Sequence, residues 1–132
     1  MIESPAIPLP HNSEKSAYVR LARTPAEIEE AQKLRYKVFY EEYGARPNEE
    51  TQREKRDFDD FDGITDHLIV LTRDARTQEE QIVGTYRLLR QSVAEEHGRF
   101  YSSSEYDLSL LLKSDNVLLE LSRSCVFAEY RT

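Results

Sequence analysis

The sequence contains no tryptophan, only four glycines and a single cysteine, Cys125, in 132 residues. A single cysteine excludes an internal disulfide framework and any metal site built from several cysteines. The three histidines, His11, His67 and His97, lack the spacing of a metal-ligand pair. We therefore expect no bound metal, and we place each histidine at the surface or in a turn.

An excess of positive charge is also absent. The 25 acidic residues outnumber the 18 lysines and arginines, and the net charge of −7 argues against a nucleic-acid partner. No apolar run is long enough to span a bilayer. The first stretch, "MIESPAIPLPHNSEK", contains Glu3 and three prolines and lacks the basic and apolar regions of a signal peptide. We therefore expect a cytoplasmic protein.

The composition that remains is that of a polar globular domain. Apolar residues make up 39% and charged residues 33%, and eight tyrosines and five phenylalanines supply core-forming side chains. The length suffices for one domain with a modest core. We expect a flexible N-terminal tail over residues 1–15 and a single domain over residues 16–132.

The first half of this domain has clear local signals. Residues 17–22 alternate apolar and polar side chains, as in a strand. Residues 25–43 form the clearest predicted helix, with Thr24 as its cap, Glu27 closing a capping box and Gly44 as its stop. The apolar stripe expected to face the core comprises Ile28, Ala31, Leu34 and Val38.

The second half is predicted with shorter elements. They are a charged loop with a short helix over 44–66, strands over 67–72 and 81–91, one or two short helices over 93–112 and a last strand over 116–127. The resulting order is β-α-(α)-β-β-α-β. This order predicts an α+β or α/β fold whose sheet is mostly antiparallel, since the two middle strands form a hairpin.

A first polar cluster lies in "RDFDDFDG", residues 56–63. Asp59 and Asp62 are three residues apart, and two neighbouring carboxylates can hold an ammonium group or a metal ion. The pattern of a calcium loop is incomplete, however. The same residues are equally compatible with an acidic surface turn from which Phe58 and Phe61 point inward.

Arg87 is a second candidate because of its position in a strand. In the alternation of residues 81–91 it shares a face with Val83, Thr85 and Leu89. A guanidinium buried alone is costly, so this side chain needs a carboxylate partner or a ligand. Alternatively, its aliphatic stem carries the charge to the surface.

The third candidate is the last strand, "LELSRSCV". Alternation places Glu120 and Ser122 on one face and Arg123 and Cys125 on the other, unless a bulge shifts the phase. Glu120 on an otherwise apolar strand is either a general base for an amine or half of a structural ion pair with an arginine. Cys125 is expected to pack in the core.

Five segments in this order closely resemble the ornithine–acyl carrier protein N-acyltransferases, a hemolysin-like branch of the GNAT superfamily: "LRYKVFYEEYGA", "FDDFDGITDHL", "VGTYRLLR", "FYSSSEYDL" and "LELSRSCV". They are also similar to the acyl-homoserine-lactone synthases, which share R-x-x-x-F, D-x-x-D, R-L-L and E-L-S-R. The synthases commonly carry a tryptophan after the helix, and its absence here favours the first group. The resemblance covers about residues 20–132.

The resemblance implies transfer of a fatty acyl chain, commonly 3-hydroxyacyl, to the α-amino group of ornithine, giving lyso-ornithine lipid. Acyl carrier protein, or acyl-CoA, would be the donor, with no bound cofactor, and the enzyme would act in the cytoplasm or peripherally at the inner membrane. Glu120 would be the general base. The matched residues of the active-site network are Arg35, Phe39, Asp59, Asp62, Arg87 and Arg123.

GNAT domains continue past this strand into a loop and helix that receive the donor phosphate. The resemblance therefore implies that the chain covers the N-terminal half of the fold, with Tyr130, Arg131 and Thr132 at the start of that loop. The last strand would be an exposed edge through which copies could pair. The alternatives are a different amine acceptor, including a homoserine-lactone precursor, and a non-catalytic half-domain that acts as a binding or assembly module.

Overall fold

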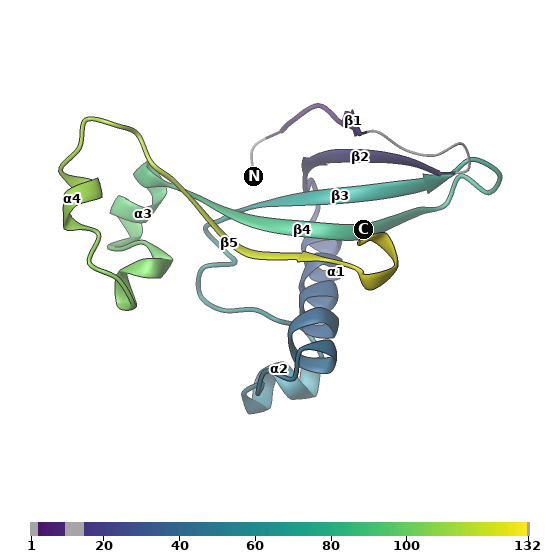
Figure 1. Cartoon of the computed structure of the whole chain (residues 1–132), viewed down its shortest axis with the longest axis horizontal. Helices are drawn as coiled ribbons and strands as arrows, with labels where there is room; N and C mark the ends of the chain where they lie inside the picture. The colour runs from purple at the N-terminus through teal and green to yellow at the C-terminus, as the bar shows by residue number, and fades with distance from the viewer. Residues whose placement is uncertain (1–2, 10–14, 132) are drawn as a thin grey trace.

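A computed structural model describes residues 3–9 and 15–131, which fold around one antiparallel sheet (Figure 1). Its strands follow each other in chain order: β1 (Ile7–Leu9), β2 (Lys15–Leu21), β3 (Asp66–Asp74), β4 (Glu80–Arg90) and β5 (Leu119–Val126). Every neighbouring pair is antiparallel. The predicted class is therefore confirmed, but β1 is an extra strand.

The expectation of a flexible tail over residues 1–15 is wrong for Ile7–Leu9, because that segment pairs with β2. His11 lies outside the described residues.

Helix α1 (Pro25–Tyr36) lies against one face of the sheet (Figure 1). Its start is built as predicted, since the hydroxyl of Thr24 accepts a hydrogen bond from the Glu27 amide at 3.2 Å. The reciprocal half of the capping box is shifted by one residue. The Glu27 carboxylate accepts from the amide of Arg23 at 2.7 Å and also pairs with Arg20 at 2.6 Å.

The predicted helix over 25–43 ends in a wider turn. Residues Lys37–Glu42 form a π-helix, η1, in which the Tyr43 amide donates to the Val38 carbonyl five residues back, at 3.0 Å. Gly44 then stops the helix with φ of 76°. Single π turns occur often at functional sites, and this one carries Tyr40, a member of the site described below.

Shorter helices occupy the two connections. Helix α2 (Glu49–Glu54) lies between η1 and β3. Between β4 and β5, helix α3 (Gln91–His97), the 3-10 turn η2 (Tyr101–Ser104) and helix α4 (Ser109–Leu112) form a lobe at one end of the sheet (Figure 1). A last 3-10 turn, η3 (Ala128–Tyr130), follows β5. Across the described ranges, no helix is both long and apolar enough to cross a membrane.

The core has two parts. Between α1 and the sheet, buried residues form two adjacent clusters, which comprise Ala22, Ala31, Ile69 and Leu71 and then Leu34, Val38 and Cys125. The helix stripe predicted from the sequence is thus confirmed, and so is the packing role of Cys125. Beneath the lobe, a separate cluster comprises Phe61, Leu89, Ala94 and Phe100. This second cluster places the lobe next to the loop that contains Phe61.

A β-bulge interrupts β5. Thr85 of β4 lies opposite Cys125, whereas Arg87 lies opposite Ser122, so β5 contains one residue more than β4 in this interval. Arg123 within the bulge has a φ of 53°. The extra residue shifts the alternation, so that Cys125 lies on the same face as Ser122 and Glu120. Cys125 and Glu120 were predicted on opposite faces unless a bulge intervened, and the bulge is present, so the two residues share a face.

Candidate active site

Three aspartates and three arginines meet between α1 and the sheet. The aspartates come from the loop before β3, and the arginines come from α1, β4 and the bulge of β5. We call this set the Asp–Arg cluster: Asp57, Asp59, Asp62, Arg35, Arg87 and Arg123. Five of its six members were predicted from the sequence. Its formal charges cancel, which allows most of it to be buried.

Arg35 holds the inner end of the cluster and is fully buried. Its Nε donates to Asp57 Oδ2 at 2.9 Å, and its Nη2 donates to Asp62 Oδ1 at 2.7 Å. The other oxygen of Asp57 accepts from the hydroxyl of Tyr40 at 2.9 Å. Burial of this phenol beside the Asp57 carboxylate raises the pKa of Tyr40 to about 12. Sequence reasoning did not single out Asp57 or Tyr40.

Arg87 is equally buried, at 1% exposure, and has the carboxylate partner that its position in the strand requires. Its Nη1 donates to Asp59 Oδ1 at 2.6 Å, and its Nε donates to the hydroxyl of Ser122 at 3.1 Å. The alternative in which its stem carries the charge to the surface is wrong. The interpretation of residues 56–63 as a surface turn is also wrong for Asp57 and Asp62, which are buried against these arginines.

Only Asp59 and Arg123 of the cluster are substantially open to solvent, with side chains 28% and 27% exposed. Arg123 Nη2 lies 3.5 Å from Asp59 Oδ2, and its Nε lies 3.6 Å from Asp57 Oδ2. Both distances allow charge attraction but exceed a normal hydrogen bond. Arg123 Nε is buried and has no hydrogen-bond partner among the described residues, although the side chain as a whole is partly exposed. The exposed part of the Arg123 side chain can therefore contact a ligand.

The charge of Asp59 is maintained by its neighbours. Burial alone would raise the pKa of this carboxyl, but the hydrogen bond and charge of Arg87 outweigh that effect and hold the pKa below its ordinary value. The amide of Phe61 also donates to Asp59 Oδ1, at 2.8 Å. Asp59 is therefore an anion at neutral pH, positioned at the solvent-facing edge of the cluster.

Tyr101 of η2 covers two of the arginines. Its ring lies 5.0 Å from the Arg87 guanidinium and 5.5 Å from that of Arg123, within the range of a cation–π interaction. The Phe61 and Tyr101 rings are nearly perpendicular, with their centroids 5.4 Å apart. Tyr101 lies in "FYSSSEYDL", one of the five segments that carry the family resemblance, but no role was predicted for it. No pattern among its neighbours in the sequence links it to arginines in two distant strands.

Glu120 holds the backbone at Tyr101 and Ser102. Its carboxylate accepts hydrogen bonds from the amides of Tyr101 and Ser102, each at 2.9 Å, and from the Ser102 hydroxyl. Within the described part of the chain, Glu120 forms no ion pair with an arginine, so that alternative is wrong. A carboxylate offers about four acceptor positions. Three are occupied, and one remains on Oε1. The general-base role of Glu120 stays a prediction.

One predicted member of the active-site network, Phe39, lies outside the Asp–Arg cluster. It packs against the hydrophobic cluster of Leu34, Val38 and Cys125 between α1 and the sheet. Burial raises the pKa of the Cys125 thiol to about 11. A thiol that stays protonated is a poor nucleophile, so Cys125 is unsuited to covalent catalysis.

The residues predicted to begin a phosphate loop fold back onto the body. The Tyr130 hydroxyl accepts a hydrogen bond from Lys15 Nζ at 2.7 Å, and Arg131 pairs with Glu42 of η1. Arg131 Nε also donates to the Val126 carbonyl at 2.9 Å. Thr132 lies outside the described residues. A phosphate-binding role for these residues stays a prediction.

His67 of β3 is buried beneath the cluster, so its predicted place at the surface or in a turn is wrong. Its Nε2 lies 2.9 Å from the Asp62 carbonyl oxygen, to which it donates when the ring is neutral. Its Nδ1 has no hydrogen-bond partner among the described residues. Burial lowers the pKa of His67 and outweighs the opposing pull of Asp62. The ring is therefore neutral at pH 7.

This buried histidine predicts a pH dependence of stability. Below a pH of about 6.5, His67 is protonated in the unfolded chain but not in the folded protein, so the free energy of unfolding should decrease as the pH is lowered. This decrease should continue until the pH reaches the lowered pKa of His67 in the folded state. Urea unfolding of His67→Gln between pH 7.5 and 5 should show a weaker pH dependence than the wild type. His97→Gln, on an exposed helix position, is the matched control, and equal slopes for both variants would contradict the assignment.

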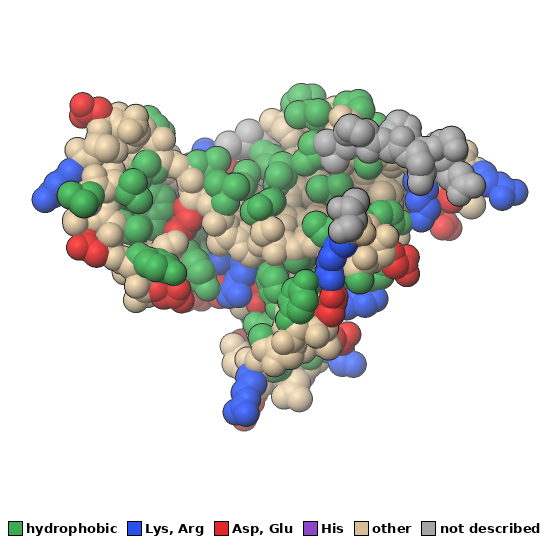
Figure 2. All heavy atoms as spheres, in the orientation of Figure 1, with side chains coloured by type: hydrophobic (Ala, Val, Ile, Leu, Met, Phe, Trp, Pro, Cys, Tyr) green, Lys and Arg blue, Asp and Glu red, His purple; other side chains and the backbone are tan. Residues whose placement is uncertain are grey.

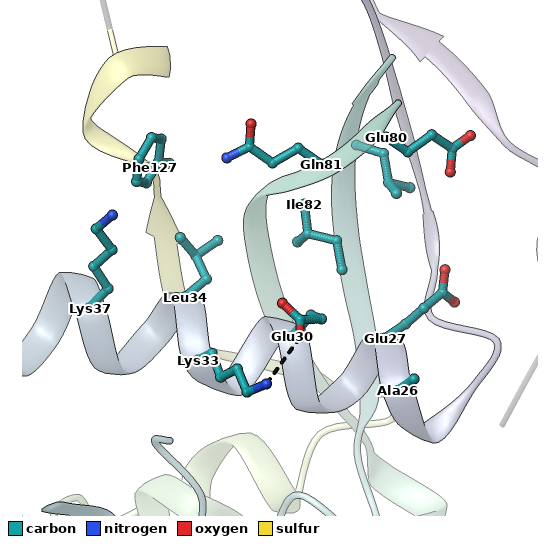
Figure 3. Close-up of a pocket in the computed structure, with 11 residues that line it drawn as sticks. Ala26, Glu27, Glu30, Lys33, Leu34, Lys37, Glu80, Gln81, Ile82 and Phe127 are labelled. Carbon is teal, nitrogen blue, oxygen red and sulfur yellow. Dashed lines mark hydrogen bonds and ion pairs between the residues drawn. The ribbon is translucent and has the colours of Figure 1, made fainter. Parts of the chain in front are cut away.

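A separate groove lies between α1 and β4 (Figure 3). Its volume is about 560 Å³, and its floor includes Leu34, Ile82 and Phe127. Its rim carries mixed charges, among them Lys33, which pairs with Glu30 at 3.2 Å. None of the Asp–Arg cluster residues lines this groove. We place the candidate site at the cluster because the buried charges and spare donors are there.

Comparisons with known proteins identify the family of this chain. The acetyltransferase (GNAT) domain family matches residues 34–132, which include the whole cluster. The chain is 55% identical over 116 residues to the L-ornithine N(alpha)-acyltransferase of Rhizobium meliloti and 51% identical over 116 residues to that of Agrobacterium fabrum. Each match covers 86% of this chain. The matches cover only 39% and 40% of those relatives, so the chain spans about two-fifths of their length.

Among solved structures, the chain is similar to TofI in a ternary complex with an inhibitor and MTA. The identity is 28%, and the match covers 83% of this chain and 56% of that chain. The TM-score of 0.40 is too low for this similarity to support a functional argument.

Proposed function

Because the chain belongs to the acetyltransferase (GNAT) domain family, we propose that it supplies the acceptor-binding part of an N-acyltransferase that acylates the α-amino group of ornithine. One observation carries this proposal: the partly exposed pair of Asp59 and Arg123, which are close but not hydrogen-bonded to each other. An amino acid carries one ammonium and one carboxylate at its α-carbon. Each charge can therefore meet its opposite in this pair.

In the proposed complex, Arg123 binds the carboxylate of the amino acid through its planar set of donors. The Arg123 side chain is partly exposed, which leaves it accessible for this contact. Asp59 accepts a hydrogen bond from an ammonium group of the substrate. The buried pairs of Arg35 and Arg87 hold the aspartates in place before the substrate arrives, so little reorganisation is needed on binding.

The chemistry requires a base, because an ammonium has no lone pair with which to attack a thioester. We propose that Glu120 accepts this proton on the free position of Oε1, directly or through a water molecule. The amine then attacks the thioester carbon, and the thiol of the donor leaves. No covalent enzyme intermediate is needed, which is consistent with a buried Cys125.

The remaining predictions concern the acyl donor, the cellular location and the pairing of copies. We propose that acyl carrier protein presents the donor and that the enzyme acts in the cytoplasm, with peripheral attachment at the inner membrane where its lipid product would accumulate. Pairing of copies through β5 also stays a proposal. It is supported by the position of β5 at the edge of the described sheet. Two apolar side chains of this strand, Leu119 and Leu121, are 50% and 57% exposed.

A hybrid enzyme tests the function. In it, this chain replaces the matching 116-residue segment of the Rhizobium meliloti relative. We expect the hybrid to form lyso-ornithine lipid from ornithine and 3-hydroxyacyl-acyl carrier protein, as measured by mass spectrometry, with the parent enzyme as positive control. A hybrid that unfolds cooperatively like the parent but makes no product, or that prefers another amine, would reject the ornithine assignment.

The same hybrid tests the substrate pair. Arg123→Leu should raise the KM for ornithine about 10- to 100-fold, because a hydrogen bond to a charged group contributes about 1.5–3 kcal/mol. Asp59→Asn should act in the same direction. Arg76→Leu, in an exposed turn, is the control and should leave KM unchanged. An Arg123 variant with unchanged KM and lower kcat would remove Arg123 from acceptor binding.

A further inference from the structure

A second cavity lies beside Glu120, between the lobe and the start of β5. Its volume is about 210 Å³. Its walls are mainly apolar and comprise Phe100, Leu108, Leu111, Leu118 and Leu119. Two polar residues, Ser102 and Glu120, complete the lining. Neither the family match nor the proposed acceptor site assigns any role to this cavity.

The chemistry of these walls selects an apolar ligand. The carboxylate of Glu120 and the hydroxyl of Ser102 are hydrogen-bonded to each other, and two amides occupy further positions on Glu120. The apolar walls therefore offer a ligand nothing but dispersion and hydrophobic contact. A cavity of about 150 Å³ lined by leucine, isoleucine and phenylalanine is large enough to hold benzene. The present cavity is larger, so it can hold a segment of hydrocarbon chain.

The cavity adjoins the candidate active site through Glu120, which lines it and holds the backbone of Tyr101. Glu120 and Ser102 form part of its wall, and the same two residues position Tyr101. The Tyr101 ring in turn covers Arg87 and Arg123. A ligand in the cavity therefore has one end at Glu120, within the site where the acceptor amine would be deprotonated.

The other end of the cavity meets an apolar surface. Leu111 and Leu119 line the cavity and are also 55% and 50% exposed. Leu110 and Val117 are more exposed still, at 84% and 91%. Figure 2 shows hydrophobic side chains gathered over the lobe that α3 and α4 form. A chain longer than the cavity could continue along this surface.

We propose that this cavity binds the hydrocarbon chain of the acyl group that is transferred, with its carbonyl end toward Glu120 and its tail toward the lobe surface. This inference rests on the proposed function. An anionic membrane is a poorer occupant, because residues 101–119 contain three acids and a single base and would be repelled by negative lipid headgroups. A neutral hydrocarbon chain meets no such barrier.

Two adjacent leucines allow a matched test with the 132-residue chain. Leu111 lines the cavity, whereas its neighbour Leu110 on α4 does not line it and is exposed. The chain is titrated with methyl octanoate, a neutral ester, and binding is followed by the NMR signals of leucine methyl groups. We expect saturable binding with shifts at Leu108 and Leu118. Leu111→Trp should weaken it about tenfold by excluding about two methylene groups, and Leu110→Trp should not.

Equal affinities for the Leu110 and Leu111 variants, or shifts confined to exposed leucines, would overturn the site. If Leu111→Trp does not fold, Leu119→Trp blocks the cavity from β5 and serves the same purpose. Binding by these variants is measured without ornithine or donor. Its outcome is therefore independent of whether the proposed reaction is correct.

The hybrid enzyme then tests whether the hydrocarbon chain that binds in the cavity is the acyl chain that is transferred. Leu111→Trp should lower kcat/KM for a long-chain donor about tenfold relative to a butyryl donor, and Leu110→Trp should leave that ratio unchanged. An active hybrid whose chain-length preference ignores Leu111→Trp overturns the acyl-chain assignment while the proposed function stands. Normal methyl octanoate binding with an inactive hybrid leaves the hydrocarbon site standing and rejects the proposed function.

Discussion

Replacing Arg35 with methionine is expected to lower the free energy of unfolding by about 3–5 kcal/mol, the cost of breaking a buried ion pair. Arg35 is fully buried and donates to both Asp57 and Asp62. Methionine keeps much of the volume of the side chain but removes every donor. The two aspartates would then have to be buried without this partner or be protonated. Urea unfolding at pH 7 measures the change.

An exposed ion pair supplies the control. Arg73 pairs with Glu80 across β3 and β4, with side chains 43% and 39% exposed. Arg73→Met should change the free energy of unfolding by less than about 1 kcal/mol, because exposed pairs contribute little. If the two variants differ by less than about 1 kcal/mol, the Asp–Arg cluster is not the structural support that its burial indicates.

Local patterns explain which features the sequence could predict. The Thr24 cap and the apolar stripe of α1 depend on residues within a few positions of each other, and both are present. The prediction for Arg87 worked for a similar reason. Alternation in a strand places it among apolar neighbours, and the cost of burying a lone guanidinium then requires a carboxylate. Only the identity of that carboxylate, Asp59, needed the fold or the family resemblance.

The features that were missed depend on contacts between distant segments. Asp57 and His67 become buried only when the loop before β3 closes over Arg35, 22 residues from Asp57 in the chain. The bulge places a non-glycine residue, Arg123, at positive φ, which alternation alone cannot predict. Strand β1 was missed because prolines depress strand propensity, and its partner strand β2 decides the outcome.

Glu120 shows why residue type and position alone left its role open. The sequence allowed either a base or half of an ion pair. The structure instead makes its carboxylate the acceptor for the first amides of η2, while one acceptor position remains free. A base and a support for Tyr101 are compatible roles, because the hydrogen bonds that fix the carboxylate also orient it. The two roles predict different kinetics.

Glu120→Gln in the hybrid enzyme is expected to lower kcat about 10²- to 10⁴-fold, the usual contribution of a positioned general base. Glutamine keeps the shape of the side chain and one acceptor oxygen. It cannot accept the proton of the substrate ammonium. The residual rate should rise with pH as the fraction of free amine grows, and more steeply than the rate of the parent hybrid. Acylation rates between pH 6 and 9 measure both effects.

Ser102→Ala separates support from proton transfer. This change removes one of the three hydrogen bonds to Glu120 but leaves the carboxylate in place. If Glu120 is the base, Ser102→Ala should reduce kcat only a few-fold and keep the pH profile of the parent hybrid. If Glu120 acts only by holding Tyr101 over Arg87 and Arg123, both variants should lose similar activity, and neither should change the pH profile. Tyr101→Leu should then reproduce the same loss, because it removes the aromatic cover while leaving the Glu120 carboxylate intact.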